Sequence, residues 1–299
     1  MNAINSAPNW SWPNGAKLAL CVVVNVEEGS EYSIADADPT PEPVDELGVV
    51  MKKPVRMHGN ESNYRYGIKE GARRITALLD AHNIQTTWTA AALSLERAPE
   101  LAHTIRSRGD ETCSHGWRWI HQFRLNQADE RAFILRAADS IAASTGTRPV
   151  GWLSRYLHTE HTRRLLQEAG FTYHMDDYSA DSPFWDAVPG SARPMVILPY
   201  ALDSNDMKMW LSPAYTPDMW LKYACDSFDV LLAEGRTGGT PPRMMSLGLH
   251  LRIIGRPGRI WALQRFLEHV ARSHGVWITT RRAVAEHFVA QVPAPTSNL

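Results

Sequence analysis

Short apolar runs alternate with longer amphipathic stretches along this chain. The clearest run, residues 17–25, is rich in β-branched side chains, with Asn14-Gly15 before it and Glu-Glu-Gly after it. This pattern predicts a strand that is buried on both faces. Comparable runs predict further strands at residues 84–89, 110–114, 149–153, 171–175, 195–198, 243–250 and 276–279.

The stretches between these runs have helical periodicity. Within residues 69–82, Ala72, Ile75, Leu78 and Leu79 recur at the spacing of one helix face. Strand and helix alternate about seven times, which predicts a mostly parallel sheet covered by helices and favours a closed α/β barrel over an open sheet. The other predicted helices occupy residues 99–107, 130–143, 160–169, 218–234, 260–273 and 280–288.

One segment departs from this alternation. A long loop at about residues 31–66 contains Asp-Pro-Thr-Pro-Glu-Pro and has little periodicity. Loops of this length are usually functional or disordered, and this one follows the carboxyl end of the first strand, where barrel enzymes place their sites. We expect a lid or a subunit contact, with a flexible insertion as the alternative. Composition changes little elsewhere, so residues 1–299 are expected to form one domain.

Composition excludes several classes of protein. The 299 residues carry 31 Lys and Arg against 32 Asp and Glu, and the sequence has no long basic block. This charge pattern argues against a nucleic-acid partner, because binding to phosphates needs clustered Lys and Arg. Three distant cysteines, Cys21, Cys113 and Cys225, fit a reducing cytoplasm better than a disulfide framework or a Cys-rich zinc module. The chain has no secretory pattern at residues 1–14 and no apolar run near the roughly 20 residues that span a bilayer, so a cytoplasmic protein without a membrane partner is expected.

Two carboxylates directly follow the first predicted strand. Glu27 and Glu28 are costly to desolvate together, which should raise the pKa of at least one of them. A raised carboxyl pKa at the end of a buried strand is typical of a general base, although most Glu-Glu pairs are solvated turns.

A second cluster follows the third strand. His115 comes just before Gly116, with Trp117 and Trp119 as candidate aromatic walls and Arg118 as a fixed cation. A single histidine is more often a packing or capping residue, but here histidine, arginine and tryptophan are concentrated within ten residues.

Other polar residues end further strands. Arg155, Asp177 (or Asp176) and His250 would converge with the first two clusters if the strands are parallel and the barrel closes. Trp88 would help to shape a flat pocket, and the stretch around Glu61 would contribute specificity. The sequence has no Gly-rich phosphate loop, dinucleotide fingerprint or Gly-x-Ser-x-Gly elbow.

Seven motifs occur in order over nearly the whole chain, at residues 25–29, 64–67, 93–97, 114–120, 162–166, 203–206 and 247–259. With these motifs the chain resembles the polysaccharide deacetylase superfamily, in particular its branch of cofactor-independent allantoinases and related cyclic-amide hydrolases. The resemblance implies a distorted (β/α)7 barrel and a homo-oligomer, expected to be a tetramer.

The resemblance also implies roles for individual residues. Glu27 occupies the position of the base and Glu28 that of a metal ligand, while the motif of two histidines keeps His115 but has Trp119 in second place. An indole nitrogen cannot ligate a metal, and a catalytic zinc usually takes three protein ligands. The resemblance therefore implies an enzyme without a metal or other cofactor.

By the same resemblance, Arg155 matches the arginine that orients the base, Asp177 or Asp176 its acidic partner, and His250 the general acid. The expected activity is hydrolysis of a carbon–nitrogen bond in a small cyclic amide or ureide, with allantoin first and hydantoins or cyclic imides next. Either Glu27 or Glu28 would activate water, and His250 or His115 would protonate the leaving nitrogen.

Arg118, Arg155 or backbone N–H groups would stabilise the oxyanion. Two other functions remain open at the level of sequence. One is a metal-dependent deacetylase of N-acetylated sugar polymers, and the other is a barrel that binds a partner without catalysis.

Overall fold

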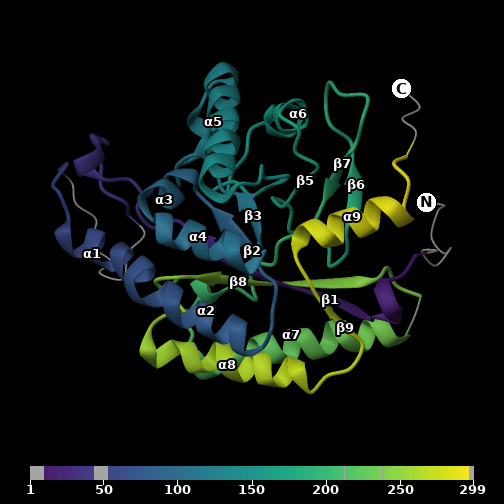
Figure 1. Cartoon of the computed structure of the whole chain (residues 1–299). Coiled ribbons are helices and arrows are strands. Elements are labelled where there is room, and N and C mark those ends of the chain that lie inside the picture. The colour runs from purple at the N-terminus through teal and green to yellow at the C-terminus, as the bar shows by residue number, and fades with distance from the viewer. Residues whose placement is uncertain (1–9, 44–52, 212, 238, 296–299) are drawn as a thin grey trace.

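The computed structural model describes residues 10–43, 53–211, 213–237 and 239–295. Its centre is one curled sheet in which parallel strands follow the order β7-β5-β4-β3-β2-β1-β8 (Figure 1). An antiparallel strand, β6, extends the sheet beyond β7, and β9 pairs with the start of β1. The strands are β1 (Leu18–Val26), β2 (Thr87–Ala90), β3 (Glu111–Ser114), β4 (Gly151–Trp152), β5 (Tyr173–His174), β6 (Phe184–Asp186), β7 (Met195–Ile197), β8 (Arg243–His250) and β9 (Val276–Ile278).

Helices cover the outer face of this sheet. In Figure 1, α2, α7 and α8 lie below the sheet and α5 and α6 above it, while α9 lies at the opposite end from α1. The helices are α1 (His58–Tyr66), α2 (Ala72–Ala81), α3 (Ala92–Arg97), α4 (Pro99–Arg108), α5 (Gln127–Thr145), α6 (Thr162–Glu168), α7 (Pro217–Thr237), α8 (Pro257–Ala271) and α9 (Arg281–Gln291). None of the helices in the described ranges is long and apolar enough to cross a membrane.

The predicted α/β barrel class is confirmed, but the sheet forms a curled half-barrel rather than a closed ladder. In the described part of the chain, no ladder joins β7 to β8. Residues after β7 fill this gap, since Asn205 forms a single bridge with Gly248 and the Gly248 N–H donates to the Ser204 carbonyl (3.2 Å). The seam between β7 and β8 is therefore formed by an irregular segment, which the strand pattern of the sequence did not indicate.

Alternation along β1 divides the core into two layers. Its even-numbered residues pack under the helices, together with the outward side of β8. Its odd-numbered residues Ala19, Cys21 and Val23 face the inside of the curl. Since successive side chains of a strand point to opposite faces, Asn25 and Glu27 continue the inner row at the carboxyl end.

The prediction of a loop at about residues 31–66 is wrong for the last part of that range. Residues 58–66 form α1, which continues through a π-helical turn (Gly67–Gly71) into α2. The sequence of α1 is almost entirely polar, so it lacks the apolar period by which a helix is predicted. Residues 44–52 of this loop lie outside the described residues.

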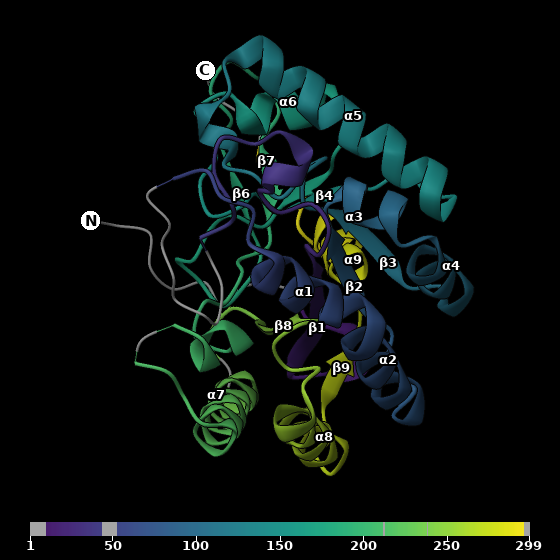
Figure 2. The ribbon, with the colours of Figure 1, turned by 90° about the vertical axis from the view of Figure 1, so that its left-hand side faces the viewer.

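The described first part of the loop is tied to the barrel by ion pairs. Arg97 binds Asp36, Arg118 binds Asp38, and Arg155 binds Glu42. Figure 2 shows this segment and α1 in front of the sheet, at the end where β1 finishes. A loose insertion does not fit these contacts.

Candidate active site

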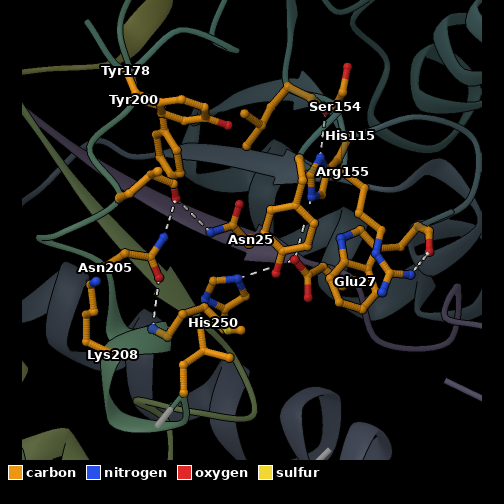
Figure 3. Close-up of a pocket in the computed structure, with 16 residues that line it drawn as sticks. Asn25, Glu27, His115, Ser154, Arg155, Tyr178, Tyr200, Asn205, Lys208 and His250 are labelled. Carbon is orange, nitrogen blue, oxygen red and sulfur yellow. Dashed lines mark hydrogen bonds and ion pairs between the residues drawn. The ribbon is translucent and has the colours of Figure 1, made fainter. Parts of the chain in front are cut away.

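The inner face of the curl opens into a cavity of about 280 Å³ at the carboxyl ends of the strands (Figure 3). Its polar side is formed by Asn25, Glu27, His115 and His250. The rest of its wall is largely apolar or aromatic, with contributions from Trp119, Leu153, Tyr156, Tyr178, Leu202, Met207 and Leu211.

Glu27 is the centre of the polar side and is only 2% exposed. Its Oε1 lies 3.3 Å from Nε2 of His250 and 3.6 Å from Nε2 of His115. Its Oε2 lies 2.7 Å from Nη1 of Arg252. One carboxylate thus faces two imidazoles and one guanidinium, which come from the carboxyl ends of two strands: His115 follows β3, and His250 and Arg252 lie at the end of β8.

The two adjacent glutamates have opposite pKa shifts. Burial acts to raise the pKa of Glu27, but Arg252, His250 and His115 together outweigh burial and hold it well below its usual range. Burial raises the pKa of Glu28, opposed by Arg252 and reinforced by the charge of Glu27. The expected upward shift therefore falls on Glu28, while Glu27, the residue in the cavity, is held ionised.

His250 is fixed by an aspartate that the candidate residues from the sequence did not include. Its Nδ1 lies 2.6 Å from Oδ1 of Asp206, whose Oδ2 accepts from the backbone N–H groups of His250 (2.7 Å) and Ile254 (3.1 Å). Burial acts to lower the pKa of His250, but Glu27 and Asp206 overcome burial and raise it to about 9. The imidazole is consequently protonated at neutral pH, with its Nε2 proton directed to Glu27.

His115 has a different support. Its Nδ1 lies 2.6 Å from the carbonyl oxygen of Leu153, which can only accept, so Nδ1 carries a proton. The Nε2 atom is left to face Glu27 and the cavity.

Arg252 was also absent from the candidate residues. It is fully buried, with its guanidinium 4.4 Å from the ring of Tyr64, 5.4 Å from Trp119 and 5.7 Å from Trp210. Aromatic faces attract a cation, so this cage holds a positive charge against Glu27. Arg252 lies two residues beyond His250 in the motif at residues 247–259, so its place in this motif was the signal that the sequence offered.

Arg155 lines the cavity but does not orient Glu27. Its guanidinium makes a buried two-point contact with Glu42 (2.7 and 2.8 Å) and lies 3.7 Å from the centre of the Trp119 ring. The implied partner, Asp177, instead accepts from Ser179, and Asp176 bonds to the Ser154 N–H and to His174. The contact expected between arginine and base is thus made by Arg252.

The structure brings together five of the residues singled out from the sequence, and these are Glu27, His115, Trp119, Arg155 and His250. It does not bring the other six into the lining of this cavity, and these are Glu28, Glu61, Trp88, Trp117, Arg118 and Asp177.

Strand alternation explains two of these corrections. Glu28 follows Glu27 and faces a second cavity beside Glu61. Trp88 points from β2 into the layer under the helices, where its indole N–H donates to Asp110 (2.9 Å).

Polar partners outside the cavity explain the others. Trp117 donates to Glu96, Arg118 is paired with Asp38, and Glu61 is paired with Arg56. Trp117 and Arg118 follow β3 in the sequence, but their spacing does not determine which way the loop turns, and Glu61 lies in α1.

The positions implied for a metal do not form a suitable donor set. Trp119 replaces one imidazole, and its N–H has no lone pair to offer. Glu28, at the carboxylate position, faces away from the cavity and contacts Arg252 (3.4 Å). Of the expected ligands only His115 faces the cavity, which is fewer than the three that a catalytic zinc usually takes.

One other set of donors is close together. His158, His174 and Asp176 have ligand atoms within 4.8 Å of one another, outside the cavity lining. The two ring nitrogens of His174 already contact Arg163 (3.3 Å) and Asp176 (2.5 Å), so this group is an internal hydrogen-bond network.

Comparison with known proteins identifies the family. The polysaccharide deacetylase family model matches residues 63–174. Over 94% of its length, the chain is 34% identical to a Schizosaccharomyces pombe (strain 972 / ATCC 24843) protein that is provisionally named a polysaccharide deacetylase, and the match covers 93% of that protein. The chain belongs to the polysaccharide deacetylase family, as its motifs indicated.

Two solved structures are similar over almost the whole chain. PuuE allantoinase is 37% identical with a TM-score of 0.89, over 97% of this chain and 95% of that one. A Pseudomonas aeruginosa PAO1 protein, provisionally described as a polysaccharide deacetylase, is 36% identical with the same TM-score, over 97% and 96%. The family and these neighbours indicate a hydrolase that acts on carbon–nitrogen bonds.

Proposed function

We propose that this protein hydrolyses a carbon–nitrogen bond of a small cyclic amide or ureide without a metal ion. The observation that carries the proposal is the contact of Arg252 with Glu27 (2.7 Å), next to a tryptophan at the second ligand position. A fixed guanidinium supplies the positive charge beside the base. The likeness to an allantoinase structure supports the same substrate class.

The arrangement of protons suits this reaction. Glu27 is ionised and takes a proton from water, and the hydroxide adds to the carbonyl carbon while the C=O electron pair moves onto oxygen. The C–N bond then breaks as His250 gives its Nε2 proton to the nitrogen. Transfer of the proton from Glu27 to His250 across their 3.3 Å contact restores both groups.

Cavity size favours a small ring over a polymer. A volume of about 280 Å³ is just below the range of about 300–1,000 Å³ that is common for ligand pockets. The second candidate is a metal-dependent deacetylase, which the Pseudomonas aeruginosa neighbour favours by its description.

The test uses a panel of allantoin, hydantoins and cyclic imides with two matched variants. Glu27→Gln is expected to lower kcat by about 10²- to 10⁴-fold, the usual contribution of a general base. Glu28→Gln, outside the cavity lining, is expected to keep kcat within about tenfold of the original by the same reasoning. Turnover of N-acetylated sugar polymers alone, or full activity of Glu27→Gln, would refute the proposal.

A further inference from the structure

The hydroxyl of Tyr200 lies in the cavity with an unusual set of partners. Its oxygen is 3.1 Å from Nδ2 of Asn25 and 3.1 Å from Nδ2 of Asn205 (Figure 3). The residue is only 5% exposed, so water does not replace these partners freely.

Both amides must donate to this oxygen. Asn205 uses its Oδ1 to accept from the backbone N–H of Met207 (2.9 Å), which leaves its NH₂ group to face Tyr200. The Nδ2 of Asn25 also lies 3.1 Å from the carbonyl oxygen of Leu249, which can only accept. Neither amide can therefore be turned over without losing a backbone hydrogen bond.

The direction of the Tyr200 proton follows from this count. Two donated hydrogen bonds occupy the acceptor capacity of the phenol oxygen, and its one proton remains to be donated. No acceptor for it occurs among the side chains and backbone groups of the described residues. Because Tyr200 lines the cavity, a bound molecule can supply the acceptor for this proton.

Local packing keeps the phenol in this place. Gly248 on β8 lies against it, and a Cβ at that position would collide with both the Tyr200 hydroxyl and the Asn205 amide. Burial raises the pKa of Tyr200, opposed by the hydrogen bond of Asn25 and reinforced by Asp206. The hydroxyl consequently stays protonated at neutral pH.

The two arginines and the other phenol considered for this role are less suited to it. Arg118 and Arg155, the side chains expected to stabilise an oxyanion, are paired with Asp38 and Glu42. Tyr178 lines the same cavity, but its side chain is 46% exposed, so water competes for its hydroxyl.

We propose that Tyr200 is a catalytic residue whose O–H donates to the substrate carbonyl oxygen and stabilises the oxyanion. This inference rests on the proposed hydrolysis. When hydroxide adds to the carbonyl carbon, the C=O electron pair becomes a charge on oxygen, and the Tyr200 hydrogen bond strengthens as that charge develops. The pair returns to re-form C=O when the C–N bond breaks, and Tyr200 keeps its proton throughout.

Tyr200→Phe removes only the hydroxyl and tests this role. We expect kcat to fall by about 10²- to 10³-fold, as for other single oxyanion donors, with KM changed by less than about threefold. Binding of a tetrahedral phosphonamidate analogue should weaken by the same factor as kcat, while binding of the planar 2-imidazolidinone should not.

Tyr173→Phe is the matched control. Its hydroxyl donates to Glu111 (2.6 Å) outside the cavity lining, so this variant also loses a buried tyrosine hydrogen bond. We expect it to lower the thermal midpoint while kcat is unchanged. A Tyr200→Phe protein that is folded and has kcat within threefold of the original would overturn the role of Tyr200.

A measurement on the unchanged protein is independent of how the variant folds. The C=O stretch of bound 2-imidazolidinone is expected at lower frequency than in an aprotic solvent, and an unshifted band would also overturn the role. Failure of the proposed function looks different, because then the unchanged protein hydrolyses no cyclic amide, or Glu27→Gln retains full turnover.

Discussion

At the scale of single residues, the site depends on which charges surround one carboxylate. Glu27 is buried, which alone would favour its neutral form, yet Arg252 and two imidazoles keep it ionised. Its neighbour Glu28 shares the burial but has the raised pKa. The alternation of side chains in β1 therefore assigns the two carboxyl groups to different environments, and only Glu27 reaches the cavity.

The state of His250 gives a prediction for pH. Its pKa is raised to about 9, so the proton needed by the leaving nitrogen is present below that pH and lost above it. We expect kcat to be level near neutrality and to fall on the alkaline side with a midpoint of about pH 9. Measured kcat–pH profiles will locate this limb.

The Asp206→Asn variant tests whether His250 is the group whose titration causes the alkaline fall in kcat. Removing the carboxylate 2.6 Å from Nδ1 takes away one of the charges that raise the pKa of His250, so the alkaline limb should move to lower pH. Circular dichroism of the variant checks that the fold is kept. An alkaline limb that stays in place would show that another group titrates there.

At the scale of elements, the long helix formed by α1, the π-helical turn and α2 supports the site from outside. Gly67 lies against the carboxyl group of Glu28, and Gly71 lies against the carbonyl of Leu251, next to Arg252. Glycine is required at Gly71 because backbone atoms of Leu251 approach so closely, whereas the close atoms at Gly67 belong to the Glu28 side chain. A π-helical turn of this kind is common beside functional sites.

Gly71→Ala tests this contact. Its Cβ would meet the Leu251 backbone, so we expect the free energy of unfolding to fall by about 1–3 kcal/mol, as for other overpacked sites. Gly258→Ala in α8 is the control, since a Cβ there meets nothing within 4 Å and helix propensity should add about 0.5–1 kcal/mol. Urea unfolding of the two variants measures both changes in the free energy of unfolding. Equal stabilities of the two variants would contradict the close packing at Gly71.

At the scale of the whole molecule, the strand and helix pattern was sufficient to predict the α/β barrel class. Apolar period and turn residues mark every long element, so β1 and β8 were found with nearly their observed bounds. The pattern missed α1, which is polar, the six-residue helix α3, and β6, which pairs only at the edge of the sheet. It could not show the seam at Asn205, because closure depends on contacts between distant segments.

The site was predictable to the extent that its residues end strands. Glu27, His115 and His250 were found in this way, whereas Trp88 has the opposite orientation within its strand. Arg252 was missed because it follows β8, where the backbone turns and strand alternation no longer determines which way a side chain points. Motif position identified the right segment, but contacts across the fold determined the partner of each charge.

The three cysteines give a prediction for the whole fold. All are free, and burial raises the pKa of Cys21 to about 12 and that of half-buried Cys225 to about 11. Thiolate is the reactive form, so a disulfide reagent at neutral pH should react slowly with Cys225 alone. Titration in denaturant should then count three thiols, and rapid native reaction of all three would contradict this packing.

The most direct test of the central claim is turnover by protein from which metal has been removed. Metal content is checked by elemental analysis, and kcat on the best cyclic amide is compared before and after one equivalent of zinc is added. Since a guanidinium stands beside the base and Trp119 holds the second ligand position, we expect full kcat without metal and no gain from zinc. Loss of activity on stripping, restored by stoichiometric zinc, would contradict it.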